Sequence, residues 1–234
     1  MRNIKAIFNK QIKDLMKNTS VLMMFIVFPV VALVFSHITG DTEGTEGIPI
    51  MMASMFAGMG IIMSVALIIA EDRENKSLRF LIMAGVKPIS YLLGVDGVIL
   101  ILGLLSSLTF GFIGGFKGQE FWIFLAAMMT AVSASTLLGA IIGISSKNQQ
   151  AANGLAMPVG MVLGFAPMLA QFNDTVARAT HIFYTQQLNV VTDSFTSLGD
   201  GRSLWQSFSI MWGNVAVFVV VFAFVFKKKG LRGE

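Results

Sequence analysis

The stretch from Glu71 to Leu93 reads EDRENKSLRFLIMAGVKPISYLL and separates two long apolar runs. Its first nine residues carry six charges. Three apolar residues follow at helical spacing: Leu78, Leu81 and Ile82. Gly85 ends this pattern, and Pro88 prevents its continuation. The spacing predicts a short amphipathic helix between two membrane spans. Such a helix either rests among the lipid headgroups or docks against a partner, and the pattern alone favours neither.

Apolar runs like the two that flank this stretch recur along the whole chain. Hydrophobic residues make up 55% of the sequence and charged residues 13%, against roughly 25% charged residues in an ordinary soluble domain. The runs are about twenty residues long, which is enough to cross a bilayer core of about 30 Å. They predict an all-α membrane protein with six transmembrane helices, at about 20–39, 50–70, 91–115, 120–143, 151–171 and 206–226.

The distribution of basic residues predicts how the chain is oriented. With both termini in the cytoplasm, fourteen of the seventeen Lys and Arg residues fall on the inner side of the membrane. The outer side then keeps only Lys117, Arg178 and Arg202. Cytoplasmic loops of membrane proteins carry this kind of excess. We therefore expect a multi-pass protein with both ends inside the cell.

Two segments outside the spans also show helical periodicity. Residues 1–18 place apolar side chains on one face and basic ones on the other, which predicts a helix lying in the membrane interface against anionic headgroups. The long outer segment 172–205 has apolar residues at near-helical spacing, so we expect one or two short helices on or dipping into the outer leaflet. Tyr184 and Trp205 are expected there as interfacial anchors.

Small and flexible side chains recur within the predicted spans. Three GxxxG pairs predict close helix packing, either within the chain or between copies: Gly111/Gly115, Gly139/Gly143 and Gly160/Gly164. Methionines follow one face of the second span, where they indicate either ordinary packing or a pliable substrate path: Met52, Met55, Met59 and Met63. Asp96, near the start of the third span, is either a structural carboxylate or part of a proton relay.

Motifs of catalytic chemistry are absent from the sequence. It contains no GxxxxGK[ST] nucleotide-binding loop, no HExxH, no GxSxG and no SxxK. It has no cysteine and two histidines, which excludes a thiolate metal site and a cysteine nucleophile. We therefore expect a chain that is not itself an enzyme and binds no cofactor. Its function must come from a path through the bundle, from a partner, or from both.

The layout of the chain resembles the membrane subunits of ABC-2 type transporters over essentially all of its 234 residues. The charged loop is similar to their consensus, in which a charged run leads into Gly-Thr-Leu and later into a proline followed by a small residue. The matching residues are Glu71, Arg73 and Glu74 for the charged run, Ser77-Leu78 for Thr-Leu, Leu81 and Ile82 for the aliphatic pair, and Pro88-Ile89-Ser90 for the end. Lys76 departs from the usual glycine, and Asp96 lies near a position where many members have lysine.

The resemblance implies that residues 71–90 hold a coupling helix that docks in a groove of a separate ATP-binding ABC subunit. ATP and Mg²⁺ would then be bound by that partner, whose closure pushes on residues 74–86. The docking residues implied are Arg73, Glu74, Ser77, Leu78, Arg79, Leu81 and Ile82. It also implies a second permease chain, either a copy or a sibling, in a bacterial cell membrane, with membrane lipids but no nucleic acid as further partners.

The function implied is ATP-driven export of a hydrophobic or amphipathic substrate, such as a drug, an antimicrobial peptide or a lipid-like molecule. One alternative is a membrane sensor or immunity protein that binds a peptide through residues 172–205 and transports nothing. Another is a passive channel or secondary transporter, but the scarcity of buried charge weighs against an ion-coupled carrier. A co-purifying ATP-binding subunit would favour the exporter, and an outer ligand without such a subunit would favour the sensor.

Overall fold

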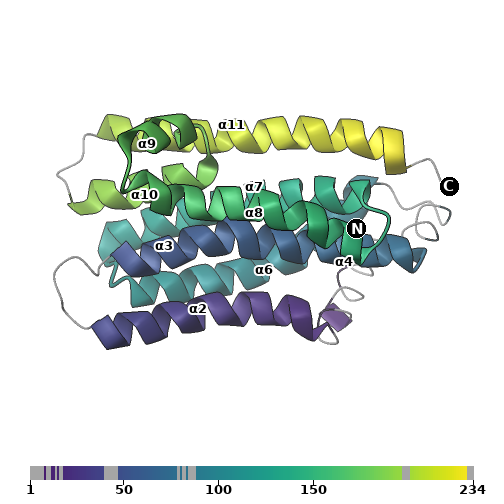
Figure 1. The fold of residues 1–234 in the computed structure, drawn as a ribbon, viewed down its shortest axis with the longest axis horizontal. Coiled ribbons are helices and arrows are strands. Elements are labelled where there is room, and N and C mark those ends of the chain that lie inside the picture. Colours follow the sequence, from purple (N-terminus) through teal and green to yellow (C-terminus); the bar gives the residue numbers. More distant parts are fainter. Residues whose placement is uncertain are drawn as a thin grey trace.

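The computed structural model describes residues 8, 12, 13, 15, 18–39, 47–77, 80, 83, 88–196 and 201–230. These residues form helices joined by turns, and the described part of the chain holds no strand. The helices shown in Figure 1 are α2 (Thr19–Thr39), α3 (Gly47–Met55), η1 (Phe56–Ile61), α4 (Ile62–Glu74), α6 (Pro88–Ile113), α7 (Gly118–Ser145), α8 (Gln149–Ala170), α9 (Asp174–Thr180), α10 (Tyr184–Thr196), α11 (Gly201–Val225) and η2 (Phe226–Gly230).

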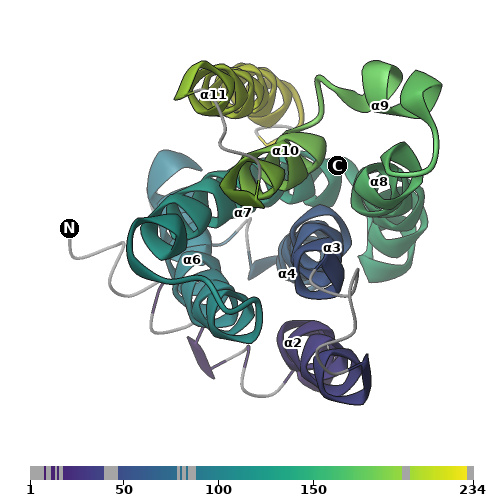
Figure 2. The same cartoon turned by 90° about the vertical axis from the view of Figure 1, so that its left-hand side faces the viewer.

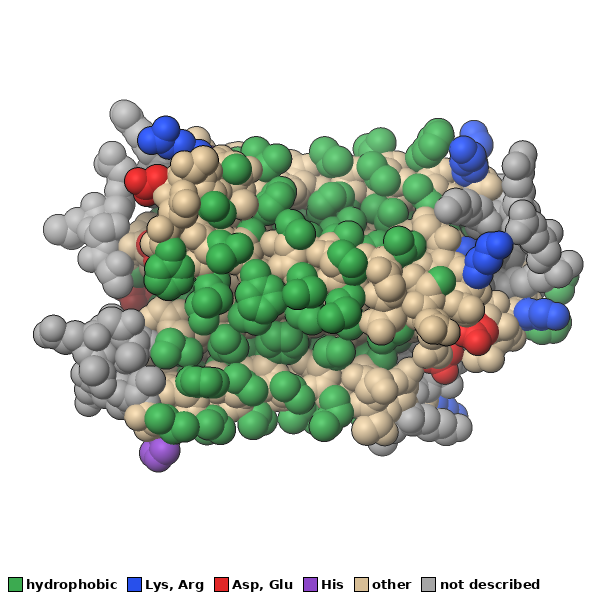
Figure 3. All heavy atoms as spheres, viewed as in Figure 1, with side chains coloured by type: hydrophobic (Ala, Val, Ile, Leu, Met, Phe, Trp, Pro, Cys, Tyr) green, Lys and Arg blue, Asp and Glu red, His purple; other side chains and the backbone are tan. Residues whose placement is uncertain are grey.

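Six helical stretches among the described residues are long and apolar enough to cross a membrane. They are Thr19–Ile38, Gly47–Glu74, Leu93–Ile113, Gly118–Ser145, Gln149–Ala170 and Leu204–Lys228. Each overlaps one predicted span, so the six-span architecture is confirmed. Figure 3 shows hydrophobic side chains over the middle of one face of the bundle, with charged side chains gathered toward its two ends. A bilayer requires this distribution, because its core offers no water to solvate charge.

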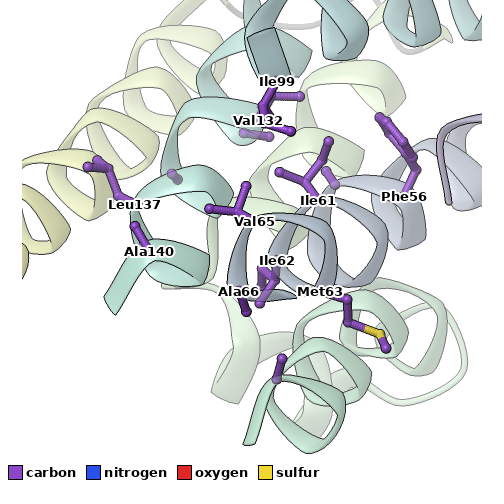
Figure 4. Packing of buried hydrophobic residues seen from close by; sticks show 14 of the residues in the cluster. Phe56, Ile61, Ile62, Met63, Val65, Ala66, Ile99, Val132, Leu137 and Ala140 are labelled. Atoms are coloured by element: carbon purple, nitrogen blue, oxygen red, sulfur yellow. The ribbon is translucent and has the colours of Figure 1, made fainter. Parts of the chain in front are cut away.

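The second span forms the centre of the bundle. It is one continuous helical rod made of α3, η1 and α4, and 78% of its most apolar window is buried, against 11% for the last span. Figure 2 looks along the bundle and shows this rod surrounded by α2, α6, α7, α8 and α10, with α11 on the outside. Figure 4 shows Ile61 and Val65 of this rod, together with Val132 of α7 and Ile99 of α6, in the buried cluster. Every neighbouring span therefore packs on the second one.

Glycines allow the neighbouring helices to approach this rod closely. A Cβ atom on Gly139 of α7 would stand 2.7 Å from the carbonyl oxygen of Ile62, and one on Gly143 would stand 2.8 Å from Ile69 Cβ. On α8, a Cβ on Gly160 would stand 3.2 Å from Met59 Cα, and one on Gly164 would stand 3.5 Å from Met55 Cα. Two of the three GxxxG pairs thus serve packing within the chain. In the third pair, Gly111 packs against Phe121, whereas Gly115 lies in a turn with a φ of 70°.

The second span is longer than the sequence predicts. Its expected end was residue 70, where the charged run begins, but α4 continues to Glu74. A charged side chain is tolerated at the end of a span when it is paired or lies near water. The four charged residues that extend α4 do have such partners, which are described in the next subsection.

The segment 172–205 contains the two expected short helices, α9 and α10. Trp205 is 79% exposed, as an interfacial anchor would be, but Tyr184 is fully buried. The prediction for Tyr184 was therefore wrong. The reason is that α10 folds back into the bundle, where it packs against α7, α8, α11 and α3.

Most of the predicted helix over residues 1–18 lies outside the described residues. Phe8, Ile12, Lys13 and Leu15 are described, and all four are helical. Leu15 is buried in the core cluster, and the Phe8 ring lies 3.4 Å from where a Cβ on Gly97 would stand. Lys13 is exposed. Phe8 and Leu15 thus pack on the bundle, whereas Ile12 and Lys13 are exposed.

Candidate functional site

The helix α4 ends in four consecutive charged residues, Glu71, Asp72, Arg73 and Glu74, which we call the α4 hub. Successive residues of an α-helix are turned by about 100° from one another, so four in a row point to all sides of the helix. At the centre of a bundle each of these sides faces a different neighbour. The hub accordingly contacts residues at the ends of α2, α6, α7 and α8.

Two hub residues hold the starts of α2 and α6. Asn18 donates from Nδ2 to Glu71 Oε2 over 2.9 Å and caps α2 by accepting from the Val21 N–H over 3.2 Å. The Tyr91 hydroxyl donates to Asp72 Oδ2 over 2.8 Å. Burial, together with the Asp72 carboxylate, raises the pKa of the Tyr91 phenol well above its ordinary value. The phenol therefore keeps the proton that this hydrogen bond needs.

The other two hub residues hold the turn between α7 and α8. Arg73 donates to the carbonyl oxygen of Ile144, in the last turn of α7. Glu74 Oε2 accepts from the backbone N–H of Gln149, the first residue of α8, over 3.1 Å. A cation at a helix C-terminus and an anion at a helix N-terminus both complement the helix dipole. The positive charge of Arg73 thus lies at the C-terminus of α7, and the negative charge of Glu74 lies at the N-terminus of α8.

Beyond the hub, the chain turns sharply at Asn75 and Lys76. Lys76 has a φ of 58°, in the left-handed region that residues other than glycine rarely adopt. The chain then becomes helical again, since Ser77, Phe80 and Met83 are helical and the Phe80 N–H donates to the Lys76 carbonyl over 3.1 Å. The predicted amphipathic helix over this stretch stays a prediction, because most of its residues lie outside the described part.

The described residues of this second helical stretch carry exposed apolar side chains. Phe80 is 63% exposed and Met83 is 65% exposed. With the half-buried Ser77 they are spaced three residues apart, so they share one face of a helix. Sequence reasoning missed Phe80 and Met83 because it followed a different apolar face. The residues of that face, and the basic residue between them, lie outside the described part: Leu78, Arg79, Leu81 and Ile82.

A polar hollow lies beside the hub. Its volume is about 370 Å³, and it is lined by Glu74, Asn75, Asn148, Gln149 and Gln150. The hollow therefore opens between the end of α4 and the α7–α8 turn. Its lining offers amide and carboxylate groups but no group of three His, Asp or Glu side chains that could hold a metal, and no such group occurs elsewhere in the described residues.

At the opposite end of the bundle, α10 is fastened to the central rod by buried polar contacts. Ser135 Oγ lies 2.6 Å from the Ala57 carbonyl oxygen and 2.8 Å from Tyr184 Oη. Ser135 Oγ also lies 2.9 Å from the Ala131 carbonyl oxygen of its own helix. The hydroxyl gives its one hydrogen to these two carbonyl oxygens, so it accepts from the Tyr184 hydroxyl. Ser54 donates to Asn189 Oδ1 over 2.6 Å. These hydroxyls were not singled out in the sequence, because serine is common in helices and its partner lies far along the chain.

A family model described as an ABC-2 family transporter protein matches residues 8–226. The match spans nearly the whole chain, from the N-terminal segment to the end of the last span. The chain belongs to the ABC-2 family of transporter proteins. A comparison with curated proteins finds no match.

Membership of the ABC-2 family makes this chain a multi-pass membrane subunit of a transport system, without an ATP-binding domain of its own. Members of the family generally work with a separate ATP-binding subunit. In this permease, Lys76 stands where the family consensus has glycine, and its φ of 58° is a conformation that glycine adopts without strain. The backbone at Lys76 is therefore one that the glycine expected from the resemblance would adopt without strain.

The predicted substrate-path residues of this ABC-2 permease lie in different surroundings. Met63 is buried in the core cluster, whereas Met52, Met55 and Met59 are half-buried. Met55 and Met59 pack on the glycines of α8. Their role in a path stays a prediction. Asp96 is buried in α6, and its Oδ1 has no hydrogen-bond partner among the described residues. Its two predicted roles, as a structural carboxylate or in a proton relay, stay predictions.

The Ser135 cluster of the permease gives a stability prediction. Tyr184→Phe removes one hydrogen bond and leaves Ser135 bonded to a backbone carbonyl, so we expect a loss of about 1 kcal/mol. Ser135→Ala leaves the Tyr184 hydroxyl buried without its partner and also removes the bond to a backbone carbonyl, so we expect a loss of about 2–3 kcal/mol. Thermal unfolding in detergent measures both.

The matched control is Ser209→Ala, because Ser209 is exposed and bonds only to the Trp205 carbonyl of its own helix. We expect it to unfold at the temperature of the unaltered chain. Equal unfolding temperatures for Ser135→Ala and Tyr184→Phe would contradict the assigned bond directions.

Proposed function

We propose that this ABC-2 permease is the membrane subunit of an ATP-driven exporter in a bacterial cell membrane, with both termini in the cytoplasm. It moves a hydrophobic or amphipathic substrate outward, and a separate ABC subunit binds ATP and Mg²⁺. Two permease chains, identical or related, make the complete transporter. The distribution of basic residues supports this orientation, since it places the hub end of the bundle inside the cell.

The observation that carries the proposal is the exposed apolar face directly beyond the hub. Phe80 and Met83 are large, apolar and exposed on the side of the membrane that the basic residues assign to the cytoplasm. A phenylalanine fills a hydrophobic groove well and gains about 1.5–3 kcal/mol when it is fully buried. We therefore assign docking to residues 77–83: Ser77, Leu78, Arg79, Phe80, Leu81, Ile82 and Met83.

Arg73 and Glu74 are left out of this docking surface. Sequence reasoning placed them at its rim, but both side chains bind the α7–α8 turn of their own chain. Arg79 keeps its assigned role at the rim, where charge sets register and the rate of encounter more than affinity.

A pull-down tests the proposal. Tagged permease is extracted from native membranes in mild detergent, co-purifying proteins are identified, and vanadate-sensitive ATP hydrolysis is measured. We expect an ABC subunit in stoichiometric amount. We expect Leu78→Asp to lose it, because a carboxylate in an apolar groove must give up its hydration. Leu78→Met, which keeps an apolar side chain of similar size, should retain it.

Two results would count against the exporter. Normal export with Leu78→Asp would overturn the docking assignment. A pure preparation of the unaltered permease without any ABC subunit would overturn ATP-driven transport itself. The sensor would then be the better explanation, and peptide binding to residues 172–205 the next measurement.

A further inference from the structure

The contacts of the α4 hub point to a role that docking does not cover. We infer that Arg73 and Glu74 are positioning residues for energy coupling, which make α4 and the α7–α8 turn move as one body. The inference rests on the proposed function, because the force that they pass on comes from an ABC subunit pressing on residues 77–83.

The first argument is where the force arrives. The docking segment begins at Ser77, and only Asn75 and Lys76 separate it from the hub. The left-handed backbone of Lys76 ends α4, so the docking segment is not a continuation of the α4 rod. A push on the segment therefore reaches the bundle through Glu74 and Arg73, the last residues of the rod.

The second argument is what these two side chains hold. Both bind backbone atoms, the Ile144 carbonyl and the Gln149 N–H, which lie on either side of the short turn from 146 to 148. Backbone groups within helices do not change rotamer, so a bond to them fixes the position of the whole turn. The turn is stiffened further because Asn148 caps α8, accepting from the Ala151 N–H over 2.8 Å.

The third argument is the packing behind the hub. α4 packs on α7 through Gly139 and Gly143, and η1 approaches α8 through Gly58, whose Cβ would stand 2.7 Å from the Gly164 nitrogen. The three helices are thus in close contact along their length as well as tied at their ends. Close-packed elements of this kind transmit displacement with little compression.

The other two hub contacts are of a different kind. Glu71 and Asp72 reach Asn18 and Tyr91 through bonds between two side chains. The Asp72–Tyr91 pair is buried, so it also holds its two helices together. The inference is therefore limited to α7 and α8, whose backbones Arg73 and Glu74 bind.

The test uses the permease reconstituted with its ABC subunit in liposomes. In Arg73→Ala and Glu74→Ala we expect the ABC subunit to be recovered in the usual ratio and ATP hydrolysis to continue. The number of substrate molecules moved per ATP should fall about ten-fold, a typical size for coupling between two sites. A purely structural role would lower the amount of complex instead.

Two control variants sharpen this test. Arg73→Lys keeps a cationic donor for the Ile144 carbonyl and should restore most of the transport per ATP. Lys147→Gln removes a charge from an exposed residue of the same turn and should leave the ratio unchanged. An unchanged ratio in both alanine variants would overturn the inference.

A distance measurement tests the rigid link directly. The natural chain has no cysteine, so Asn75→Cys and Lys147→Cys place two spin labels without background. We expect one narrow distance between the labels, the same in the ATP-free and vanadate-trapped complexes. Adding Arg73→Ala and Glu74→Ala together should broaden it. A distance that changes between the two states of the unaltered hub would overturn the inference.

This second readout separates failure of the inference from failure of the proposed function. If the unaltered permease recruits no ABC subunit, the proposed function fails and the coupling role fails with it, even where the label distance in the purified chain remains narrow. If the unaltered permease shows ATP-driven transport, and the hub variants move as many substrate molecules per ATP as it does, the inference alone fails.

Discussion

Phe80→Asp is expected to abolish recovery of the ABC subunit with the permease. Phe80 is 63% exposed and shares a helix face with Met83. If this face fills a groove, the ring is the kind of central aromatic contact whose loss costs about 2 kcal/mol or more. The new carboxylate adds the cost of its own desolvation. Affinity should fall at least about 30-fold, which a stringent pull-down registers as loss of the partner.

The matched control lies at the other end of the bundle. Phe172 is 79% exposed and follows the end of α8, so Phe172→Asp makes the same chemical change on the opposite side of the membrane. We expect full recovery of the ABC subunit with that variant. Phe80→Leu should retain part of the affinity because it keeps an apolar side chain. Equal recovery with Phe80→Asp and Phe172→Asp would show that Phe80 lies outside the docking surface.

Gly58→Leu is expected to prevent the chain from folding. A Cβ at this position would stand 2.7 Å from the Gly164 nitrogen and 2.8 Å from its Cα. Backbone atoms cannot move aside as a side chain does, so η1 and α8 must separate. Overpacking a core typically destabilises a protein by about 1–3 kcal/mol. Because two whole helices must separate here, we expect Gly58→Leu to lose about 3 kcal/mol of folding stability or more.

The measurement is the fraction of monodisperse protein in detergent, followed by its unfolding temperature. Gly154→Leu is the control, because a Cβ on Gly154 of α8 meets nothing within 4 Å. We expect that variant to behave as the unaltered chain does. A folded Gly58→Leu variant with an unchanged unfolding temperature would mean that η1 and α8 do not touch at this point.

The sequence predicted the spans well and their contacts poorly. A run of about twenty apolar residues has one low-energy place, across the bilayer, and this depends on composition alone. The end of the second span was misplaced by a turn because Glu71–Glu74 are acceptable in a helix only through partners as distant as Gln149. Nothing local to the charged run shows those partners.

Tyr184 and the hub show the same limit. A tyrosine beside a span suits the membrane interface until α10 folds back and buries it against Ser135. Arg73 and Glu74 were assigned to a docking rim, which stays a prediction, and the sequence gives no sign of the bonds that they form with the α7–α8 turn. In each case the side chain has the chemistry that was expected, and the tertiary fold decides which partner uses it.

The π-helical segment η1 has a consequence for the hub at the far end of the same rod. A π-turn holds an additional residue compared with an α-turn, so the residues that follow are set back by about 100° around the helix axis for each residue gained. The four hub residues point to four sides of the helix in any case, and η1 sets which of them faces which neighbouring helix. Without that offset, each charge of the hub would point at the wrong neighbour. The segment Phe56–Ile61 thus sets the rotational orientation of the hub residues, which lie nearly three turns further along the helix.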